Sequence, residues 1–145
     1  MSKKYIKSSH PGHWDGIETK SYKTEGSSFK DIVRRTLIDK DFSDCVTELR
    51  YFEVAVGGYS SLEKHQHTHT VIITQGKARV IVGEEVFDAK VHDVFYVSPW
   101  QIHQFIQAGN APLGFYCMVP KNRDRPNLLP ADEQKKYQER LGAKI

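Results

Sequence analysis

The sequence contains little cysteine and no long apolar segment. Only two cysteines occur in 145 residues, Cys45 and Cys117, and their separation matches neither a zinc-binding cluster nor a redox pair. No run of residues is apolar enough for a secretory signal or a membrane span. We therefore expect a cytoplasmic protein that keeps both thiols free, since structural disulfides are rare in reducing compartments.

Charge of one sign is also scarce. The 21 lysines and arginines nearly balance the 18 aspartates and glutamates, which leaves a formal net charge of +3. The basic residues are scattered, and their longest cluster is Lys135-Lys136, so the sequence lacks the basic patch that is typical of nucleic-acid binding. The sequence thus predicts no nucleic-acid partner and no membrane partner.

The length of the chain predicts one domain with a core large enough to enclose a pocket. Residues 1–28 are polar and rich in turn-forming residues, so we expect an irregular N-terminal arm. Residues 29–120 carry short β-branched and aromatic runs, which are typical of an all-β barrel or sandwich such as the jelly roll. Residues 121–145 are predicted to form a loop and a short C-terminal helix that packs on the barrel.

Several segments have the composition of strands. The candidates are residues 32–38, 47–56, 71–74, 78–82, 85–87, 94–97, 103–106 and 114–119. Gly83-Glu84 separates two of them, and a glycine at the first turn position is typical of a type II′ hairpin. A helix is predicted only near the C-terminus, where Pro130 suits its start and Gly142 its end.

Four residues have the spacing of a metal site: Glu63, His65, His69 and His103. Side chains at i and i+2 of a strand share a face, so Glu63 and His65 point the same way. A turn can then bring His69 to the adjacent antiparallel strand. Imidazole together with carboxylate suits a divalent transition ion such as iron, manganese, nickel or zinc better than calcium, which prefers oxygen ligands.

The frame around these residues resembles that of the cupins, small jelly-roll metalloproteins that are also described as double-stranded β-helices. The first cupin motif reads Gly-x5-His-x-His-x3/4-Glu-x6-Gly, and Gly57, His65 and Gly76 occupy matching positions. The other two metal positions are exchanged, with Glu63 in place of the first histidine and His69 in place of the glutamate. The resemblance implies a cupin jelly-roll barrel with a shell of three histidines and one glutamate.

The second cupin motif, Gly-x5-Pro-x-Gly-x2-His-x3-Asn, matches in spacing around its histidine, which is His103. The residues in place of its two glycines, proline and asparagine are His92, Trp100, Ser98 and Gln107. The resemblance extends over roughly residues 45–120. It does not define a reaction, because one fold hosts many chemistries.

Two other interpretations of the histidines stay open at this point. His65 and His67 can be taken as the His-x-His pair of the motif, with His67 instead of Glu63 as a ligand. In that register the residues at the glutamate and second glycine positions no longer match the motif. Alternatively, the histidines form an exposed polar strand face that binds metals adventitiously.

A divalent ion held by three neutral imidazoles and one carboxylate remains a Lewis acid and keeps up to two adjacent positions open. Such a centre suits a small oxygen-rich substrate with two neighbouring oxygens, such as an enediol or an α-hydroxyketone. Within the resemblance we expect a metal-dependent oxidoreductase of the dioxygenase type. Two alternatives stay open: a non-redox isomerase or lyase of a sugar or keto acid, and a binding or sensor cupin without catalysis.

Further residues are expected around the metal. His67 is the candidate general base. Aromatic and thiol side chains near the motifs are expected to line the substrate pocket, namely Tyr59, Tyr96, Trp100, Phe105 and Cys117. The resemblance also implies a homodimer, in which an N-terminal strand of each chain, here within residues 29–38, adds to the partner's sheet and hides an edge.

Overall fold

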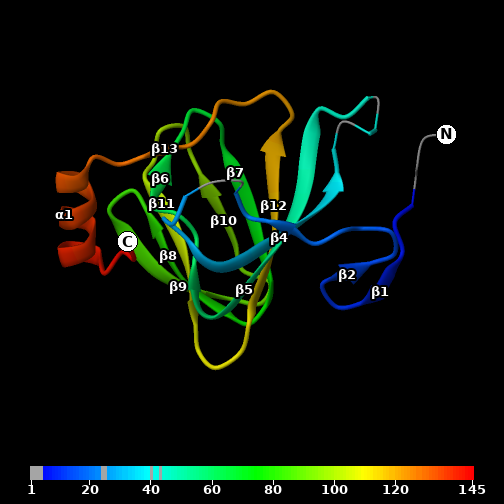
Figure 1. Ribbon diagram of the computed structural model, residues 1–145, viewed down its shortest axis with the longest axis horizontal. Helices are drawn as coiled ribbons and strands as arrows, with labels where there is room; N and C mark the ends of the chain where they lie inside the picture. Colours follow the sequence, from blue (N-terminus) through cyan, green and yellow to red (C-terminus); the bar gives the residue numbers. More distant parts are fainter. Residues whose placement is uncertain (1–4, 24–25, 40, 43) are drawn as a thin grey trace.

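The computed structural model describes residues 5–23, 26–39, 41–42 and 44–145, and within these ranges the chain is mostly strand with one helix (Figure 1). The elements in chain order are β1 (Ser8–His10), β2 (His13–Trp14), β3 (Lys20–Ser21), β4 (Lys30–Ile38), β5 (Thr47–Tyr59), β6 (Glu63–Lys64), β7 (His69–Gln75), β8 (Lys77–Val82), β9 (Glu85–Lys90), β10 (Val94–Val97), β11 (His103–Ala108), β12 (Leu113–Pro120), β13 (Asn127–Leu128) and α1 (Ala131–Leu141).

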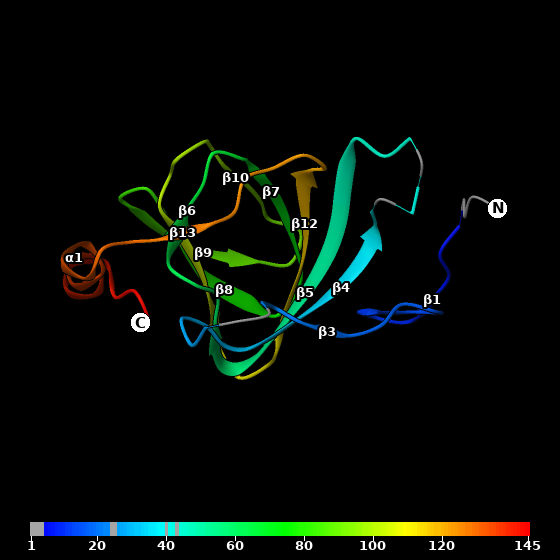
Figure 2. The same cartoon turned by 45° about the horizontal axis from the view of Figure 1, so that its top comes forward.

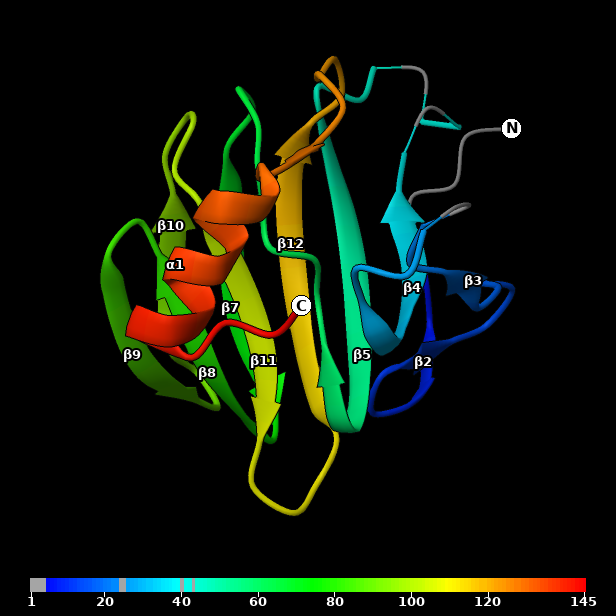
Figure 3. The same ribbon diagram turned by 60° about the vertical axis from the view of Figure 1, so that its left-hand side comes forward.

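The main sheet curls so that its two halves face each other (Figures 1 and 3). One half runs β10-β7-β12-β5 with β4 beside β5, and the other contains β9, β8, β11, β6 and β13. Strand β5 joins the halves, because it pairs with β4 and β12 along its length and with β11 at its end, where Tyr59 meets Ile106. All described pairings are antiparallel, so the predicted all-β jelly-roll barrel is confirmed.

Alternating burial explains how the strands form this barrel. In β7 the buried residues are His69, Val71 and Ile73, and the residues between them are partly exposed. This period of two places one side of the strand in the core. Phe52 of β5 and Phe115 of β12 stack inside with their ring centroids 5.4 Å apart. The interior is therefore apolar, except where polar side chains share the inward face.

The motif glycines occupy positions that other residues tolerate poorly. Gly76 has φ +69°, and a Cβ there would lie 2.2 Å from the carbonyl oxygen of Pro112. Gly57 also has positive φ, and its N–H donates to the side-chain oxygen of Gln107 at 2.9 Å. The second motif keeps the same backbone shape without glycine, since His92 and Trp100 have φ of 77° and 64°. The backbone thus supports the register of both motifs.

The C-terminal helix forms where the sequence predicts it. Helix α1 follows Pro130 and ends at Gly142, which adopts the left-handed conformation typical of a helix end. The Tyr137 hydroxyl donates to the Gly83 carbonyl in the β8–β9 hairpin at 2.9 Å, so the helix is tied to the barrel (Figure 2). No helix among the described residues is both long and apolar enough to cross a membrane.

The N-terminal arm contains a small antiparallel pair, β1 and β2, outside the main sheet. Trp14 packs its ring on Tyr51 at 5.2 Å between centroids, and Arg35 donates to the Gly12 carbonyl at 3.1 Å. After the arm, β4 pairs with β5 of the same chain. Cys45 and Cys117 are both free thiols.

Candidate metal centre

Three histidines from different parts of the chain converge inside the barrel. His65 follows β6, His69 begins β7 and His103 begins β11, and all three are at most 7% exposed. Their candidate ligand atoms lie within 4.8 Å of one another. The Nε2 atoms of His65 and His69 are 2.9 Å apart. The fold therefore gathers three of the four predicted metal ligands.

Backbone carbonyls fix which ring nitrogen of two histidines carries the proton. His65 Nδ1 is 2.7 Å from the His67 carbonyl, and His103 Nδ1 is 2.9 Å from the Gln101 carbonyl. A carbonyl only accepts, so each Nδ1 donates and each Nε2 keeps a free lone pair. His69 Nδ1 lies 3.0 Å from the Cys117 thiol. Orienting partners of this kind are typical of metal-binding histidines.

Burial keeps these imidazoles neutral. It lowers the pKa of His65 and that of His103 to about 4. Burial also lowers the pKa of His69 well below its ordinary value, and the neighbouring His103 and Arg50 lower it further. The neutral imidazole is the form that binds a metal, so at neutral pH the three side chains need not lose a proton first.

The donor set fits a divalent transition ion. His103 Nε2 is buried and has no hydrogen-bond partner in the described part of the chain, which is costly unless a ligand satisfies it. A metal–nitrogen distance of about 2.1 Å places neighbouring ligands of an octahedral ion about 3 Å apart. The 2.9 Å separation of the His65 and His69 Nε2 atoms agrees with that value.

Glu63, the fourth predicted ligand, lies beside this group and binds a lysine. It pairs with His103 across β6 and β11 and is 5% exposed. Its carboxylate forms an ion pair with Lys23 at 2.5 Å and lies outside the three-histidine group of ligand atoms. Glu63 as a metal ligand stays a prediction.

His67, the predicted general base, stacks on His65 with ring centroids 3.6 Å apart. Its Nδ1 is 2.9 Å from Asp124 Oδ1. The same oxygen accepts the N–H of His67, and Asp124 Oδ2 accepts the N–H of Gln66. These hydrogen bonds, first of all the one from Gln66, hold the pKa of Asp124 well below its usual range. His65, His67 and Asp124 form a second group with metal-binding spacing, which corresponds to the alternative register.

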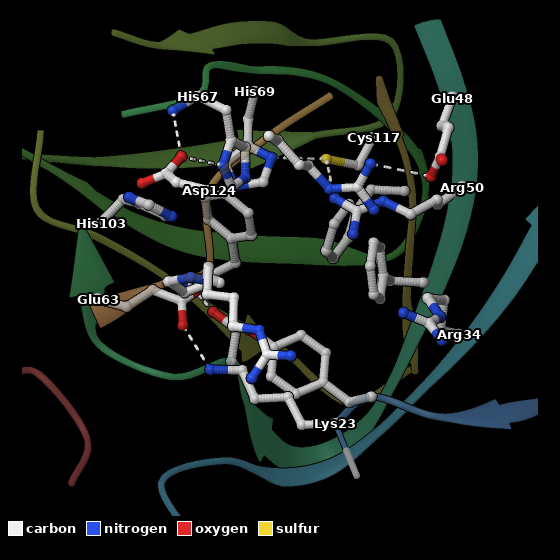
Figure 4. A pocket seen from close by; sticks show the side chains of 18 of the residues that line it. Lys23, Arg34, Glu48, Arg50, Glu63, His67, His69, His103, Cys117 and Asp124 are labelled. Carbon is white, nitrogen blue, oxygen red and sulfur yellow. Dashed lines mark hydrogen bonds and ion pairs between the residues drawn. The ribbon is translucent and has the colours of Figure 1, made fainter. Parts of the chain in front are cut away.

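A cavity of about 740 Å³ adjoins the histidines (Figure 4). The structure places two of the predicted pocket residues, Phe105 and Cys117, in its wall. Three others lie outside that wall: Tyr59 packs in a second apolar cluster, and Tyr96 and Trp100 are 53% and 55% exposed.

Sequence reasoning missed the cationic side of this cavity. The cations on this side are Lys23, Arg34 and Arg50, and the carboxylate of Asp124 also lines the cavity. One signal was available for Arg50, because it stands two residues before Phe52 and four before Val54, on the inward face of β5. Lys23 and Asp124 lie in loops whose course the strand pattern does not determine.

Comparison with known proteins agrees with this architecture. Residues 50–119 match the model of the Cupin domain family. A curated protein from Rhodospirillum rubrum, called 1-methylthio-D-xylulose 5-phosphate methylsulfurylase, is 40% identical over 116 residues, which cover 79% of this chain and 73% of that protein. The chain belongs to the cupin family.

Two solved structures show the same relationship. A cupin 2 conserved barrel domain protein from Rhodopseudomonas palustris has a TM-score of 0.85 and 37% identity, over 93% of this chain and 92% of that one. A cupin-2 domain protein from Rhodospirillum rubrum has a TM-score of 0.80 and 35% identity, over 88% and 84% of the two chains.

Proposed function

We propose that this protein is a metal-dependent cupin enzyme that acts on a small oxygen-rich molecule, with a ketose phosphate as the first candidate substrate. One observation carries the proposal: the three buried histidines His65, His69 and His103 converge beside a cavity of about 740 Å³. Because the tautomers of His65 and His103 are fixed from the backbone, their Nε2 lone pairs are available to an ion.

A divalent ion at this position supplies Lewis-acid polarisation of a carbonyl group when it is bound. The cavity wall contributes apolar surface from Phe52, Phe105 and Phe115, which excludes water and strengthens electrostatic interactions. We assign the transfer of a proton to His67. Its Nδ1 is held on Asp124, so its Nε2 is the atom that accepts one.

The named relative supports the choice of substrate. 1-Methylthio-D-xylulose 5-phosphate is a ketose phosphate in which the C2 carbonyl adjoins the C3 hydroxyl. These are the two neighbouring oxygens expected of a substrate that chelates such a centre. The 40% identity to this relative supports a sugar phosphate as substrate, and we therefore rank this reaction ahead of a dioxygenase reaction.

The test is turnover of 1-methylthio-D-xylulose 5-phosphate by protein loaded in turn with manganese, iron, nickel or zinc. We expect the S-methyl proton resonance of the substrate to disappear with at least one metal and to persist with metal-free protein. His67→Gln should slow turnover by about a hundredfold or more at unchanged metal content. Substrate that stays intact with all four metals would contradict the proposed substrate.

A dioxygenase is the second candidate, and the position of Glu63 favours it. While Glu63 is paired with Lys23, only the three histidines would hold the ion, which would leave it free to bind both an organic substrate and dioxygen. An oxygen electrode separates the two reactions. Consumption of one dioxygen per substrate in the iron-loaded protein would establish the oxygenase, and metal-dependent turnover without oxygen uptake would establish the first candidate.

We also propose that the protein forms a homodimer, as the family resemblance implies. Light scattering at several protein concentrations tests it, and a mass of one chain throughout would contradict it. The predicted exchange of residues 29–38 between chains needs a test of its own, because β4 pairs with β5 of its own chain and a dimer does not require the exchange.

A further inference from the structure

Arg34 and Arg50 lie on the inward face of the sheet, on the same wall of the cavity as Cys117. Arg50 stands opposite Cys117 in the β5–β12 register, and Arg34 stands opposite Phe52, two residues along β5 from Arg50. Diagonal neighbours of this kind are within reach of long side chains. Figure 4 shows both arginines on the far side of the cavity from Glu63 and His103.

Both arginines have a buried donor without a partner. The Nε atoms of Arg34 and Arg50 have no hydrogen-bond partner in the described part of the chain. Buried donors are normally paired, and an unpaired one is costly. Two such atoms on neighbouring side chains therefore indicate a place where several oxygens of a ligand can accept hydrogen bonds.

The carboxylates around the cavity are already committed to other partners. Glu63 pairs with Lys23, and Glu48 pairs with Arg123 at 3.0 Å. Asp124 holds His67 and the backbone beside it. Within the described ranges, neither Arg34 nor Arg50 forms an ion pair with a carboxylate. The wall thus presents two cations that form no ion pair with a carboxylate of these ranges.

The local electrostatics also favour an anion at this place. Burial lowers the pKa of Arg34, the positive charges of Arg50 and Arg123 lower it further, and the carboxylate of Glu48 offsets part of this effect. An anion placed among these cations relieves their mutual repulsion. A dianion with three terminal oxygens matches the paired guanidinium groups better than a single carboxylate does, because each guanidinium offers its donors in a planar fork.

The cationic wall is connected to the candidate metal centre through one side chain. Arg50 Nη2 lies 3.5 Å from the Cys117 sulfur, and the same sulfur lies 3.0 Å from His69 Nδ1. A ligand in the cavity can therefore reach both the histidine group and the arginines when a short carbon chain separates its chelating oxygens from its anionic group.

We propose that Arg34 and Arg50 form a phosphate-binding subsite, so that the enzyme selects phosphomonoesters over the corresponding free sugars. The subsite rests on the proposed function, since it assumes that the metal centre and the arginines hold opposite ends of one substrate. Arg123, Lys121 and Arg125, which also line the cavity, add positive charge at its rim.

The experiment is calorimetric titration of the metal-loaded protein with D-xylulose 5-phosphate and, separately, with D-xylulose. Wild type should bind the ester at least about tenfold more tightly than the sugar. Arg34→Met and Arg50→Met should each weaken binding of the ester by about ten- to a hundredfold and leave binding of the sugar unchanged. Arg50→Lys should fall between wild type and Arg50→Met, because it keeps the charge and loses the fork.

Two further readouts separate this proposal from the proposed function. Metal content measured by mass spectrometry should be unchanged in both variants, and Arg140→Met, which removes an equal charge from the exposed last turn of α1, should bind the ester as wild type does. Ester binding that is unchanged in Arg34→Met and Arg50→Met would overturn the subsite and leave the metal centre in place. Arginine-dependent binding of inorganic phosphate by a protein that takes up no metal would support the subsite and overturn the metal-dependent function.

Discussion

The two polar regions of the cavity differ in how their buried nitrogen atoms find partners. In the histidine region, two Nδ1 atoms bind carbonyls and the third contacts a thiol, so Nε2 atoms remain for one small ion. In the arginine region, the Nε atoms of Arg34 and Arg50 have no partner in the described chain. From this contrast we infer that the chain itself orients the ligands of an ion, whereas the proposed anion subsite is completed by its ligand.

The largest expected effect comes from removing one imidazole from the histidine region. His103→Ala leaves two ligands, so we expect metal affinity to fall by more than about a hundredfold, beyond the effect of losing an orienting partner. Competition with a fluorescent chelator measures it. Arg34→Met, which changes no group in contact with the histidines, should keep full metal affinity.

His10→Gln is the control for this experiment, because it removes an imidazole from the exposed arm. The two proteins should have similar circular dichroism spectra. Equal metal affinity in His103→Ala and His10→Gln would show that the metal binds outside the histidine region.

A smaller effect is expected at the residue that joins the two regions. Cys117→Val removes the group that contacts His69 Nδ1, so this nitrogen becomes a buried polar atom without its partner. Loss of an orienting partner typically lowers metal affinity by about ten- to a hundredfold. Cys117→Ser keeps a hydroxyl that can accept from Nδ1 and should restore most of that loss. Equal affinities in the two variants would mean that the thiol does not orient His69.

The histidine region could be predicted because its residues lie at fixed spacing near strand ends. The alternation of strands places Glu63 and His65 on one face, and the frame of Gly57 and Gly76 sets the register. The pairing of Glu63 with Lys23 could not be predicted, because Lys23 comes from the N-terminal arm, 40 residues earlier in the chain. No local pattern determines where such an arm lies.

The arginine region, in contrast, could not be predicted from the sequence. Arg34 and Arg50 are ordinary strand residues in the sequence, and they become neighbours only through the pairing of β4 with β5. The exposure of Tyr96 could not be predicted from the pattern of its strand either, and Trp100 lies beyond that strand, in a turn. Period-two alternation assigns faces within a strand, but it does not decide which face of a short edge strand such as β10 is covered.

The smallest effect is expected at Glu63. Glu63→Gln removes the charge that pairs with Lys23 and keeps the size of the side chain. If the carboxylate leaves Lys23 and binds the ion, as expected of the fourth ligand, metal affinity in Glu63→Gln should fall by about tenfold, less than on loss of a histidine. Lys23→Met should then raise it, because the carboxylate is freed. An unchanged affinity in both variants would show that the histidines bind the metal without Glu63.

The most direct measurement is an anomalous difference map from crystals of the protein loaded with manganese or zinc. We predict one peak within about 2.0–2.2 Å of the Nε2 atoms of His65, His69 and His103. The alternative group of His65, His67 and Asp124 also has metal-binding spacing. A peak among those three residues, with the Nε2 atom of His103 left unbound, would contradict the proposed metal centre.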